Sequence, residues 1–292
     1  MKKNKKRKLD IAVISDVHLG TFGCRAVELN NYLKTINPKI LILNGDIIDI
    51  WQFNKRYFPK PHLKVIKQIM SFITSGTKVY YITGNHDETL RKFRGFSLEN
   101  FEIVNKVVLD IDGKKGWFFH GDVFDVTMQH SKWLAKLGGI GYDTLIILNT
   151  AVNWISEQFG YGRLSFSKKI KNSVKSAVKF INNFETTASD IAISEGYDYV
   201  VCGHIHQPEI REIQNDGGKT LYLNSGDWIE NLTALEYKEK KWSLYEYEKD
   251  ELAKNTHLNT KVTDFELVGT EGNNAQLFEE LLAEFNINKS SK

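Results

Sequence analysis

The chain has little of what marks a secreted, membrane-spanning or disulfide-bonded protein. Its 292 residues include only two cysteines, Cys24 and Cys202, which cannot form a disulfide framework and favour a reducing compartment. No stretch reaches the roughly 18 apolar residues of a membrane span. The basic start, residues 1–8, lacks the apolar core of a signal peptide. We therefore expect a cytoplasmic protein.

A large excess of charge is also missing. The formal net charge is +3, and no long basic run follows residue 8, so we expect no nucleic-acid partner. Prolines number four and charged residues make up 26%, which excludes wholesale disorder. The hydrophobic content of 41% is enough for one large core with an insertion. Nothing in the composition indicates an oligomeric state.

Short apolar runs alternate with helical patterns in the first third of the chain. Apolar runs at 11–14, 40–43 and 79–82 predict buried strands, and residues 25–36 and 62–74 have helical spacing. This alternation favours an α/β fold with a parallel or mixed sheet. Three short antiparallel strands are expected next, at 101–104, 107–111 and 117–119. Strands of a second sheet are expected at 199–202, 209–213, 220–223, 234–237 and 242–247.

Polar residues fall where these strands end. In open α/β sheets, ligands bind just beyond the carboxyl ends of the strands, so such residues can share one rim. Six strand ends deliver the following side chains: Asp16 and His18, Asp46, Asn85 and His86, His120, His204 and His206, and Asp227.

Five short motifs occur in one order: D-x-H, G-D-x-x-D, G-N-H-D, H-G-D and G-H-x-H. D-x-H alone occurs by chance, but two histidines two residues apart after an apolar strand are costly to bury unless both have partners. Together, over residues 10 to about 230, the motifs resemble the calcineurin-like metallophosphoesterase family. The resemblance implies two mixed β-sheets sandwiched between helices, with a helical cap insertion.

The family resemblance also implies a dinuclear metal site. One ion would be held by Asp16, His18, Asp46 and His206, and the second by Asp46, Asn85, His120 and His204, with Asp46 bridging. Carboxylate, amide and imidazole ligands suit Mn²⁺, with Fe²⁺ or Zn²⁺ as alternatives, and the absence of thiolates argues against a structural zinc site. Two ions about 3.5–4 Å apart can clamp the attacking and leaving oxygens of an in-line displacement.

Five further residues near the motifs are candidates for catalysis or for supporting contacts. The resemblance implies that His86 lies at the scissile group without binding metal, and that it stabilises the transition state or protonates the leaving oxygen. Asp87 would orient His86. Asp49 and Asp122 are expected to make supporting hydrogen bonds or to contact substrate, and Asp227 to support a ligand histidine.

An aromatic, helical insertion is expected at about 126–195, inside a metallophosphoesterase domain of residues 1–250; the tail, 251–292, has no assigned role. The insertion could be a plain helical subdomain or a cap with an apolar channel for an acyl chain. A lysine row that includes Lys168 and Lys171 could be a solvated face. It could also, with Arg163, attract a diphosphate or an anionic membrane.

A closer resemblance comes from the D-x-H-L-G opening, the G-D-x-x-D-x-W segment and the ending G-D-W at 226–228. These resemble the UDP-2,3-diacylglucosamine pyrophosphatases of lipid A synthesis. The resemblance implies cleavage to UMP and 2,3-diacylglucosamine 1-phosphate, Mn²⁺ dependence, and peripheral attachment to the inner membrane. In that branch an arginine stands where this chain has His86, so the substrate does not follow from the metal motifs.

Two other functions remain open from the sequence. A metallophosphodiesterase or phosphatase could use the same metal ligands on a soluble nucleotide or a phosphoprotein. A non-catalytic scaffold could use the same fold, but every expected ligand type is present in this chain. The expected substrate is a nucleotide-diphospho lipid. The residues expected to contact it are Asn85, Asp122, Arg163, Lys168 and Lys171.

Overall fold

The computed structural model describes residues 6–50, 58–125, 181–251 and 253–254. The chain divides into two compact units, residues 1–121 with 192–292, and residues 122–191, and each is described by itself. The first unit contains a seven-stranded sheet in the order β12-β11-β1-β2-β3-β5-β4. Its strands are β1 (Arg7–Ile14), β2 (Ile36–Asn44), β3 (Lys78–Ile82), β4 (Ser97–Leu98), β5 (Phe101–Val104), β11 (Thr233–Lys238) and β12 (Lys241–Glu246).

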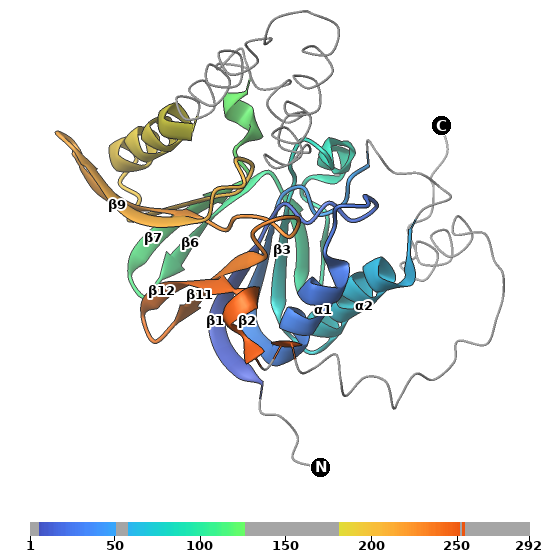
Figure 1. Ribbon diagram of the computed structural model, residues 1–292. Coiled ribbons are helices and arrows are strands. Elements are labelled where there is room, and N and C mark those ends of the chain that lie inside the picture. The colour runs from blue at the N-terminus through green and yellow to red at the C-terminus, as the bar shows by residue number, and fades with distance from the viewer. Residues whose placement is uncertain (1–5, 51–57, 126–180, 252, 255–292) are drawn as a thin grey trace, which may run out of the picture. The chain divides into compact units, whose positions relative to one another are not determined.

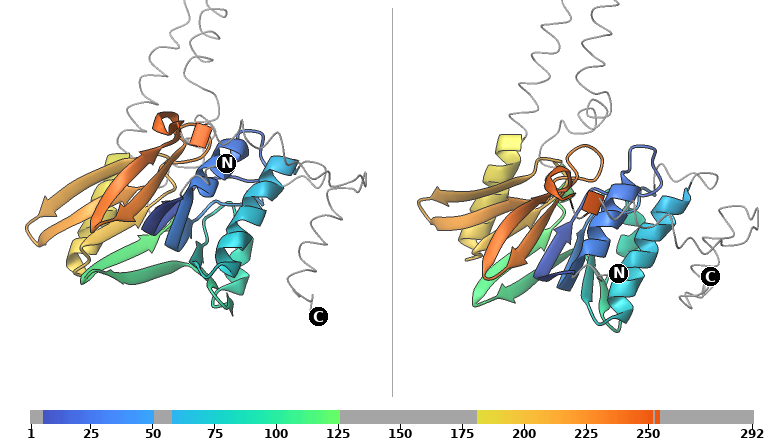
Figure 2. Two further views of the ribbon diagram at one scale, coloured as in Figure 1. Left: turned by 90° about the horizontal axis from the view of Figure 1, so that it is seen from below. Right: turned by 60° about the horizontal axis from the view of Figure 1, so that its bottom comes forward.

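Strands β1, β2, β3 and β5 of this sheet run parallel, as the strand–helix alternation predicts. The connections are α1 (Ala26–Thr35) and α2 (Lys60–Thr74), which lie side by side on one face of the sheet (Figures 1 and 2). Leu29 and Leu33 of α1 and Val65 of α2 are fully buried in one cluster with Leu41 of β2. The apolar stripe of each helix therefore covers the sheet.

The second sheet has five strands in the order β6-β7-β8-β10-β9. They are β6 (Lys106–Ile111), β7 (Lys114–Phe119), β8 (Tyr199–Cys202), β9 (Glu209–Asn215) and β10 (Gly218–Asn224), and β7, β8 and β10 are parallel. Val13 and Ile42 of the first sheet pack in one cluster with Phe118, Val201 and Leu223 of the second. The expected α/β fold with two mixed sheets is therefore confirmed.

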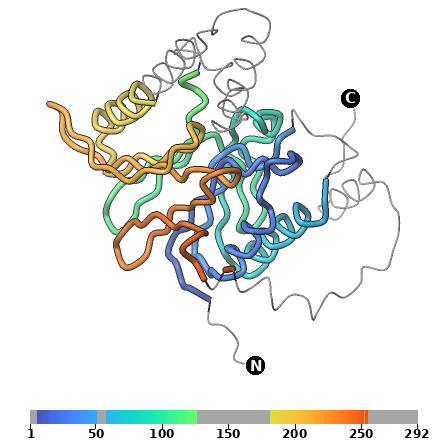
Figure 3. The backbone as a smooth tube through the Cα atoms, in the orientation of Figure 1, coloured from blue at the N-terminus to red at the C-terminus, as the bar shows by residue number. Residues whose placement is uncertain are grey.

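Two of the expected strand pairings are wrong. Residues 101–104 were predicted as part of an antiparallel group, but β5 pairs parallel with β3 in the first sheet. Residues 234–237 and 242–247 were assigned to the second sheet, but β11 pairs antiparallel with β1, and β12 with β11. In Figure 3 the late, orange-to-red part of the backbone returns beside the blue start. Apolar periodicity identifies a strand without specifying its distant neighbour.

The second unit is described only at its two ends. It contains η2 (Asp122–Phe124) and helical residues 181–191, and the rings of Phe124 and Phe184 meet edge to face at 5.5 Å. Most of the expected cap, and the tail beyond residue 254, lie outside the described residues, so the cap stays a prediction. Within the described part of the chain, no helix has the length and apolar content to cross a membrane.

Candidate metal centre

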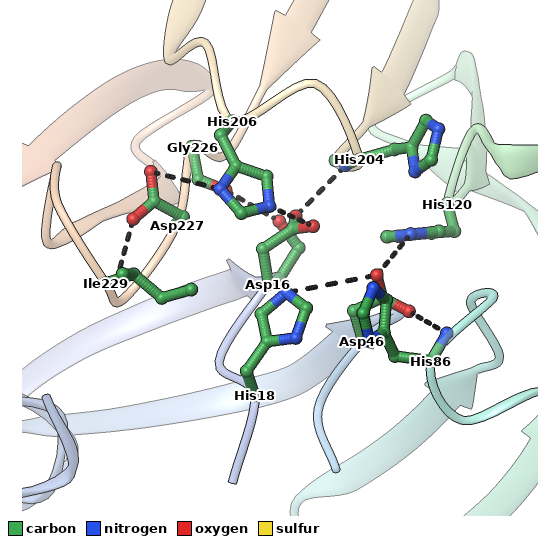
Figure 4. A network of polar contacts seen from close by, with 12 residues as sticks. Asp16, His18, Asp46, His86, His120, His204, His206, Gly226, Asp227 and Ile229 are labelled. Atoms are coloured by element: carbon green, nitrogen blue, oxygen red, sulfur yellow. Dashed lines mark hydrogen bonds and ion pairs between the residues drawn. The ribbon is translucent and has the colours of Figure 1, made fainter. Parts of the chain in front are cut away.

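The predicted site residues of the first unit follow the carboxyl ends of parallel strands in both sheets. Asp16 and His18 follow β1, Asp46 follows β2, and Asn85 and His86 follow β3. In the second sheet, His120 follows β7, and His204 and His206 follow β8. Figure 4 shows the labelled aspartates and histidines pointing toward one another from these loops. The strand ends that the sequence singled out therefore form one cluster.

Asp16 is the centre of one half of this cluster. Its Oδ1 lies 3.2 Å from His206 Nε2, and its Oδ2 accepts the backbone N–H of His204 at 3.0 Å. The rings of His18 and His206 lie 5.7 Å apart. Ligand atoms of Asp16, His18 and His206 all lie within 4.8 Å of one another, close enough to bind a single ion.

Asp46 is the centre of the second half of the cluster, and its carboxylate also lies near His18 of the first half. Its Oδ2 lies 3.2 Å from His120 Nε2 and 4.0 Å from His18 Nε2. Its Oδ1 accepts the backbone N–H of His86 at 2.8 Å. Asp46, His120 and His204 form a second group with ligand atoms within 4.8 Å, and Asp46 also belongs to a third group with His18 and His86. Asp46 therefore has the position expected of a bridging carboxylate.

Orphaned polar atoms show that the cluster fits a cation. Asn85 Oδ1 and His18 Nε2 are buried and have no hydrogen-bond partner among the described residues. A buried acceptor without a partner costs about 1–3 kcal/mol, and a bound cation removes that cost. The donor set of carboxylate, amide oxygen and imidazole is one that Mn²⁺, Fe²⁺ and Zn²⁺ accept.

Five of the candidate ligands have a left-handed backbone. The values of φ are 51° at Asp16, 52° at His18, 54° at Asp46, 68° at His204 and 53° at His206. A non-glycine residue in this region costs of order 1 kcal/mol, and such residues persist where surrounding contacts hold them. Backbone hydrogen bonds join the loop after β1 to the loop after β2, because the N–H groups of Val17 and His18 both donate to Asp46 O at 2.9 Å.

The motif glycines are required by close approach. A Cβ on Gly84 would lie 2.2 Å from Asp46 Oδ1, and one on Gly203 would lie 2.6 Å from Asp16 Oδ2. Both distances are far below van der Waals contact. Glycine therefore precedes Asn85 and His204 because the central carboxylates lie directly against the backbone at those positions.

The charges of the cluster are strongly coupled. Burial tends to raise the pKa of Asp16, but His206 and His120 outweigh it and lower that pKa to about 2. Burial likewise opposes the shift at Asp46, where His120, His18 and His86 hold the pKa well below its usual range. Burial lowers the pKa of His206, yet Asp16 and Asp227 raise it to about 9. The two carboxylates are thus ionised, and a cation must displace a proton from the His206 imidazole.

The carboxylate that contacts His86 is Asp49, not Asp87 as the sequence predicted. Asp49 is 1% exposed, and its Oδ2 lies 2.9 Å from His86 Nδ1 and 3.3 Å from His18 Nδ1. Asp87 instead accepts the N–H of Gly84 at 2.6 Å, and the Ile47 N–H and the Tyr81 hydroxyl. Asp87 is buried, and its hydrogen bonds stabilise the backbone of the loops at Gly84 and Ile47.

Two supporting contacts hold ligand histidines from outside the cluster. Asp227 Oδ2 lies 3.9 Å from His206 Nδ1, while its Oδ1 accepts the Ile229 N–H at 2.8 Å, in line with the support expected of Asp227. His120 Nδ1 lies 2.9 Å from the backbone carbonyl of Asn44, which the sequence analysis missed. A backbone carbonyl leaves no side-chain signal in a sequence. The hydrogen bond to the Asn44 carbonyl fixes the tautomer and orientation of the His120 imidazole.

The remaining predicted substrate contacts lie in the second unit or outside the described residues. Asp122 begins η2 in the second unit. Arg163, Lys168 and Lys171 lie outside the described residues. Their expected contacts with substrate therefore stay predictions.

The sequence profile of the calcineurin-like phosphoesterases matches residues 9–208, about two thirds of the chain. This chain belongs to the calcineurin-like phosphoesterase family, and it is a metal-dependent phosphoester hydrolase. The family uses divalent metals, in agreement with the fit of the cluster to a cation.

More particular relatives are UDP-2,3-diacylglucosamine hydrolases. The protein of that name from Aliivibrio fischeri is 23% identical over 253 residues, covering 82% of this chain and 99% of its own. The one from Blochmanniella pennsylvanica is 25% identical, covering 80% of this chain and 93% of its own. Among solved structures, a phosphoesterase from E. coli aligns with a TM-score of 0.41 at 14% identity, covering 81% of this chain and 92% of that chain.

Proposed function

We propose that this protein hydrolyses the diphosphate of UDP-2,3-diacylglucosamine, using two divalent ions held around Asp46. The observation that carries the proposal is that the Asp46 carboxylate lies close to ligand histidines on both sides. It lies 3.2 Å from His120 on one side and 4.0 Å from His18 on the other, between two groups of ligand atoms. A two-ion site of this kind suits in-line displacement at phosphorus.

The ligand assignment follows these groups. One ion is held by Asp16, His18, Asp46 and His206, and the other by Asp46, Asn85, His120 and His204. When bound, the ions supply Lewis-acid activation of the phosphoryl oxygens and of the attacking water. Mn²⁺ is the proposed ion, as the resemblance to the pyrophosphatases implies, and these oxygen and nitrogen ligands also accept Fe²⁺ or Zn²⁺ as alternatives.

His86 is proposed to hold a proton at the scissile group. Burial lowers the pKa of His86, but the Asp49 hydrogen bond and the charges of Asp46 and Asp49 raise it above its ordinary value. Bound cations would oppose the effect of Asp46, whereas the hydrogen bond to Asp49 would remain. His86 Nδ1 lies 2.9 Å from Asp49 Oδ2, so the proton that we assign to the reaction is the one on Nε2. His86 thus donates to the leaving oxygen or stabilises the charge that develops there.

The proposed reaction adds water at the α-phosphorus and breaks its bond to the bridging oxygen. The products are UMP and 2,3-diacylglucosamine 1-phosphate, so every atom of the substrate and water is accounted for. Support for this substrate comes from relatives named UDP-2,3-diacylglucosamine hydrolase, which this chain matches over nearly their whole length. The proposal includes peripheral attachment to the inner membrane, where an acylated substrate resides, and a role for Asp122, Arg163, Lys168 and Lys171 in binding it.

A second candidate is favoured by one residue. The resembled pyrophosphatases have an arginine where this chain has His86, and an imidazole offers a diphosphate fewer N–H donors than a guanidinium does. A soluble nucleotide or another phosphodiester would need only the metal cluster and a proton donor. Under this second proposal, acyl chains would not affect turnover.

The test uses Mn²⁺-loaded protein and UDP-2,3-diacylglucosamine in mild detergent, with products identified by mass spectrometry. Asp46→Ala is the control for contaminating hydrolases. Release of UMP and the lipid 1-phosphate by the wild type alone is the expected result. If an aryl phosphodiester is cleaved but the lipid substrate is not, the metal assignment survives and the second candidate replaces the first.

A further inference from the structure

Residues 91–98, separated from the G-N-H-D motif by three residues, contain exposed apolar and basic side chains. The side chains of Phe93, Phe96 and Leu98 are 50%, 40% and 47% exposed. Every residue from 92 to 99 is exposed, the last turn of η1 (Glu88–Phe93) included. Three large apolar side chains are therefore exposed within six residues, a concentration that favours a contact surface over singly scattered surface residues.

The charge of this segment has one sign. Arg91, Lys92 and Arg94 lie among the apolar residues, and residues 91–98 contain no acid. Lys92 and Arg94 are both exposed. Arg91 reaches back to donate to the carbonyl of Gly84 at 3.3 Å, which ties the segment to the loop of Asn85 and His86.

Backbone hydrogen bonds give the segment a defined shape. The N–H of Phe96 donates to Phe93 O at 2.9 Å, and the N–H of Ile103 donates to Phe96 O at 3.0 Å. Leu98 pairs with Phe101 where β4 meets β5 at the edge of the sheet. In Figure 1, η1 is the short helix in the teal part of the chain, beyond the end of β3. The apolar side chains are thus held outward on an ordered turn.

We propose that residues 91–98 dock the protein on an anionic lipid bilayer. Aromatic rings flanked by cations suit the bilayer interface, because the rings enter the headgroup region while the cations contact lipid phosphates. A stable protein interface needs about 20–30 residues on each side, which this segment does not provide. The inference deepens the proposed function, because it assigns the proposed membrane attachment to residues 91–98, and its test does not depend on turnover.

The test is sedimentation of the full-length protein with vesicles of phosphatidylcholine, with or without a quarter of phosphatidylglycerol. Binding is expected for the anionic vesicles and should weaken at about 0.5 M NaCl. Lys92→Ala with Arg94→Ala should weaken binding roughly thirtyfold, at about fivefold for each surface cation. Phe93→Ser with Phe96→Ser should weaken it by at least about tenfold at any salt concentration.

Matched controls keep the result specific to the segment. Lys240→Ala with Lys241→Ala removes the same charge from the exposed β11–β12 turn, and Val108→Ser removes an apolar side chain that is 43% exposed on β6. Both controls should bind like the wild type. All variants should keep their thermal stability and their activity on a soluble aryl phosphodiester, because the changed side chains are exposed.

Three results would overturn the docking inference. The first is a wild type that does not sediment with anionic vesicles. The second is equal binding by the segment variants, which would point to another basic part of the chain, such as residues 1–8. The third is a large loss of thermal stability in Phe93→Ser with Phe96→Ser, which would show that the rings pack within the protein. Failure to cleave the lipid substrate would leave the docking inference intact.

Discussion

Replacing Asp49 by asparagine tests how His86 is held. The Asp49 carboxylate lies 2.9 Å from His86 Nδ1 and is almost fully buried. Asparagine keeps the shape and one acceptor oxygen but removes the negative charge. The substitution should therefore leave His86 in place while reducing its hold on a proton.

The expected loss can be worked out from this contact. A hydrogen bond to a charged group contributes about 1.5–3 kcal/mol, so losing it from the transition state lowers kcat about 10- to 150-fold. The Asp49 hydrogen bond and charge raise the pKa of His86 against the lowering effect of burial. If the protonated imidazole is the active form, activity falls as pH rises through that pKa. In Asp49→Asn, the alkaline limb should therefore move to lower pH.

The assay is the pH profile of kcat for the Mn²⁺-loaded enzyme. Metal content must be measured beside it, because Asp49 Oδ2 also lies 3.3 Å from His18 Nδ1. Asp49→Asn should then be combined with His86→Ala. If Asp49 acts through His86, the double variant should be little slower than His86→Ala alone.

Asp87→Asn is the matched control. It should lower thermal stability, because Asp87 accepts hydrogen bonds from the Gly84 and Ile47 N–H groups and the Tyr81 hydroxyl, but it should not move the alkaline limb. An unchanged limb in Asp49→Asn, or a shifted limb in Asp87→Asn, would refute the assignment of Asp49 as the positioning residue. Full additivity in the double variant would refute it as well.

The other predictions concern the metals and the core around them. Asp46→Ala should lose both ions, measured by mass spectrometry of the desalted protein, and activity should fall by orders of magnitude; two retained ions would rule out the bridging role. Gly84→Ala should destabilise the fold by about 1–3 kcal/mol in urea unfolding, because the new Cβ would lie 2.2 Å from Asp46 Oδ1. Mn²⁺ binding near pH 7.5 should release protons, since Asp16 and Asp227 raise the pKa of His206 to about 9 against the lowering effect of burial. Calorimetry in buffers of different ionisation enthalpy would detect the release. Equal binding heats in these buffers would contradict the prediction. His62, whose Nδ1 accepts the Gly20 N–H at 3.0 Å, has its pKa lowered from 6.5 to about 4 by burial. As pH falls, the unfolded chain therefore protonates His62 before the folded chain does. The free energy of unfolding should decline between pH 6.5 and pH 4 by up to about 3 kcal/mol. His62→Asn should reduce this decline, and an identical pH dependence in that variant would disprove the assignment.

The strands and the first rim residues were predictable because they depend on local pattern. The run from Ile11 to Ile14 is apolar and β-branched, and the structure has it in β1 with Asp16 and His18 directly after it. The same reasoning located the ends of β2, β3, β7 and β8. The glycines of the motifs also helped to identify the site, since a Cβ at Gly84 or Gly203 would clash with a ligand carboxylate.

Sequence alone determined which residues end strands and which of them can bind a divalent ion, because periodicity and side-chain chemistry are properties of short segments. The tertiary structure decided which segments meet. It paired β11 with β1, placed Asp49 rather than Asp87 against His86, and set the Asn44 carbonyl behind His120. These contacts join residues far apart in the chain, or use backbone atoms common to every residue. No local pattern records them, and only the packing of two sheets brings them together.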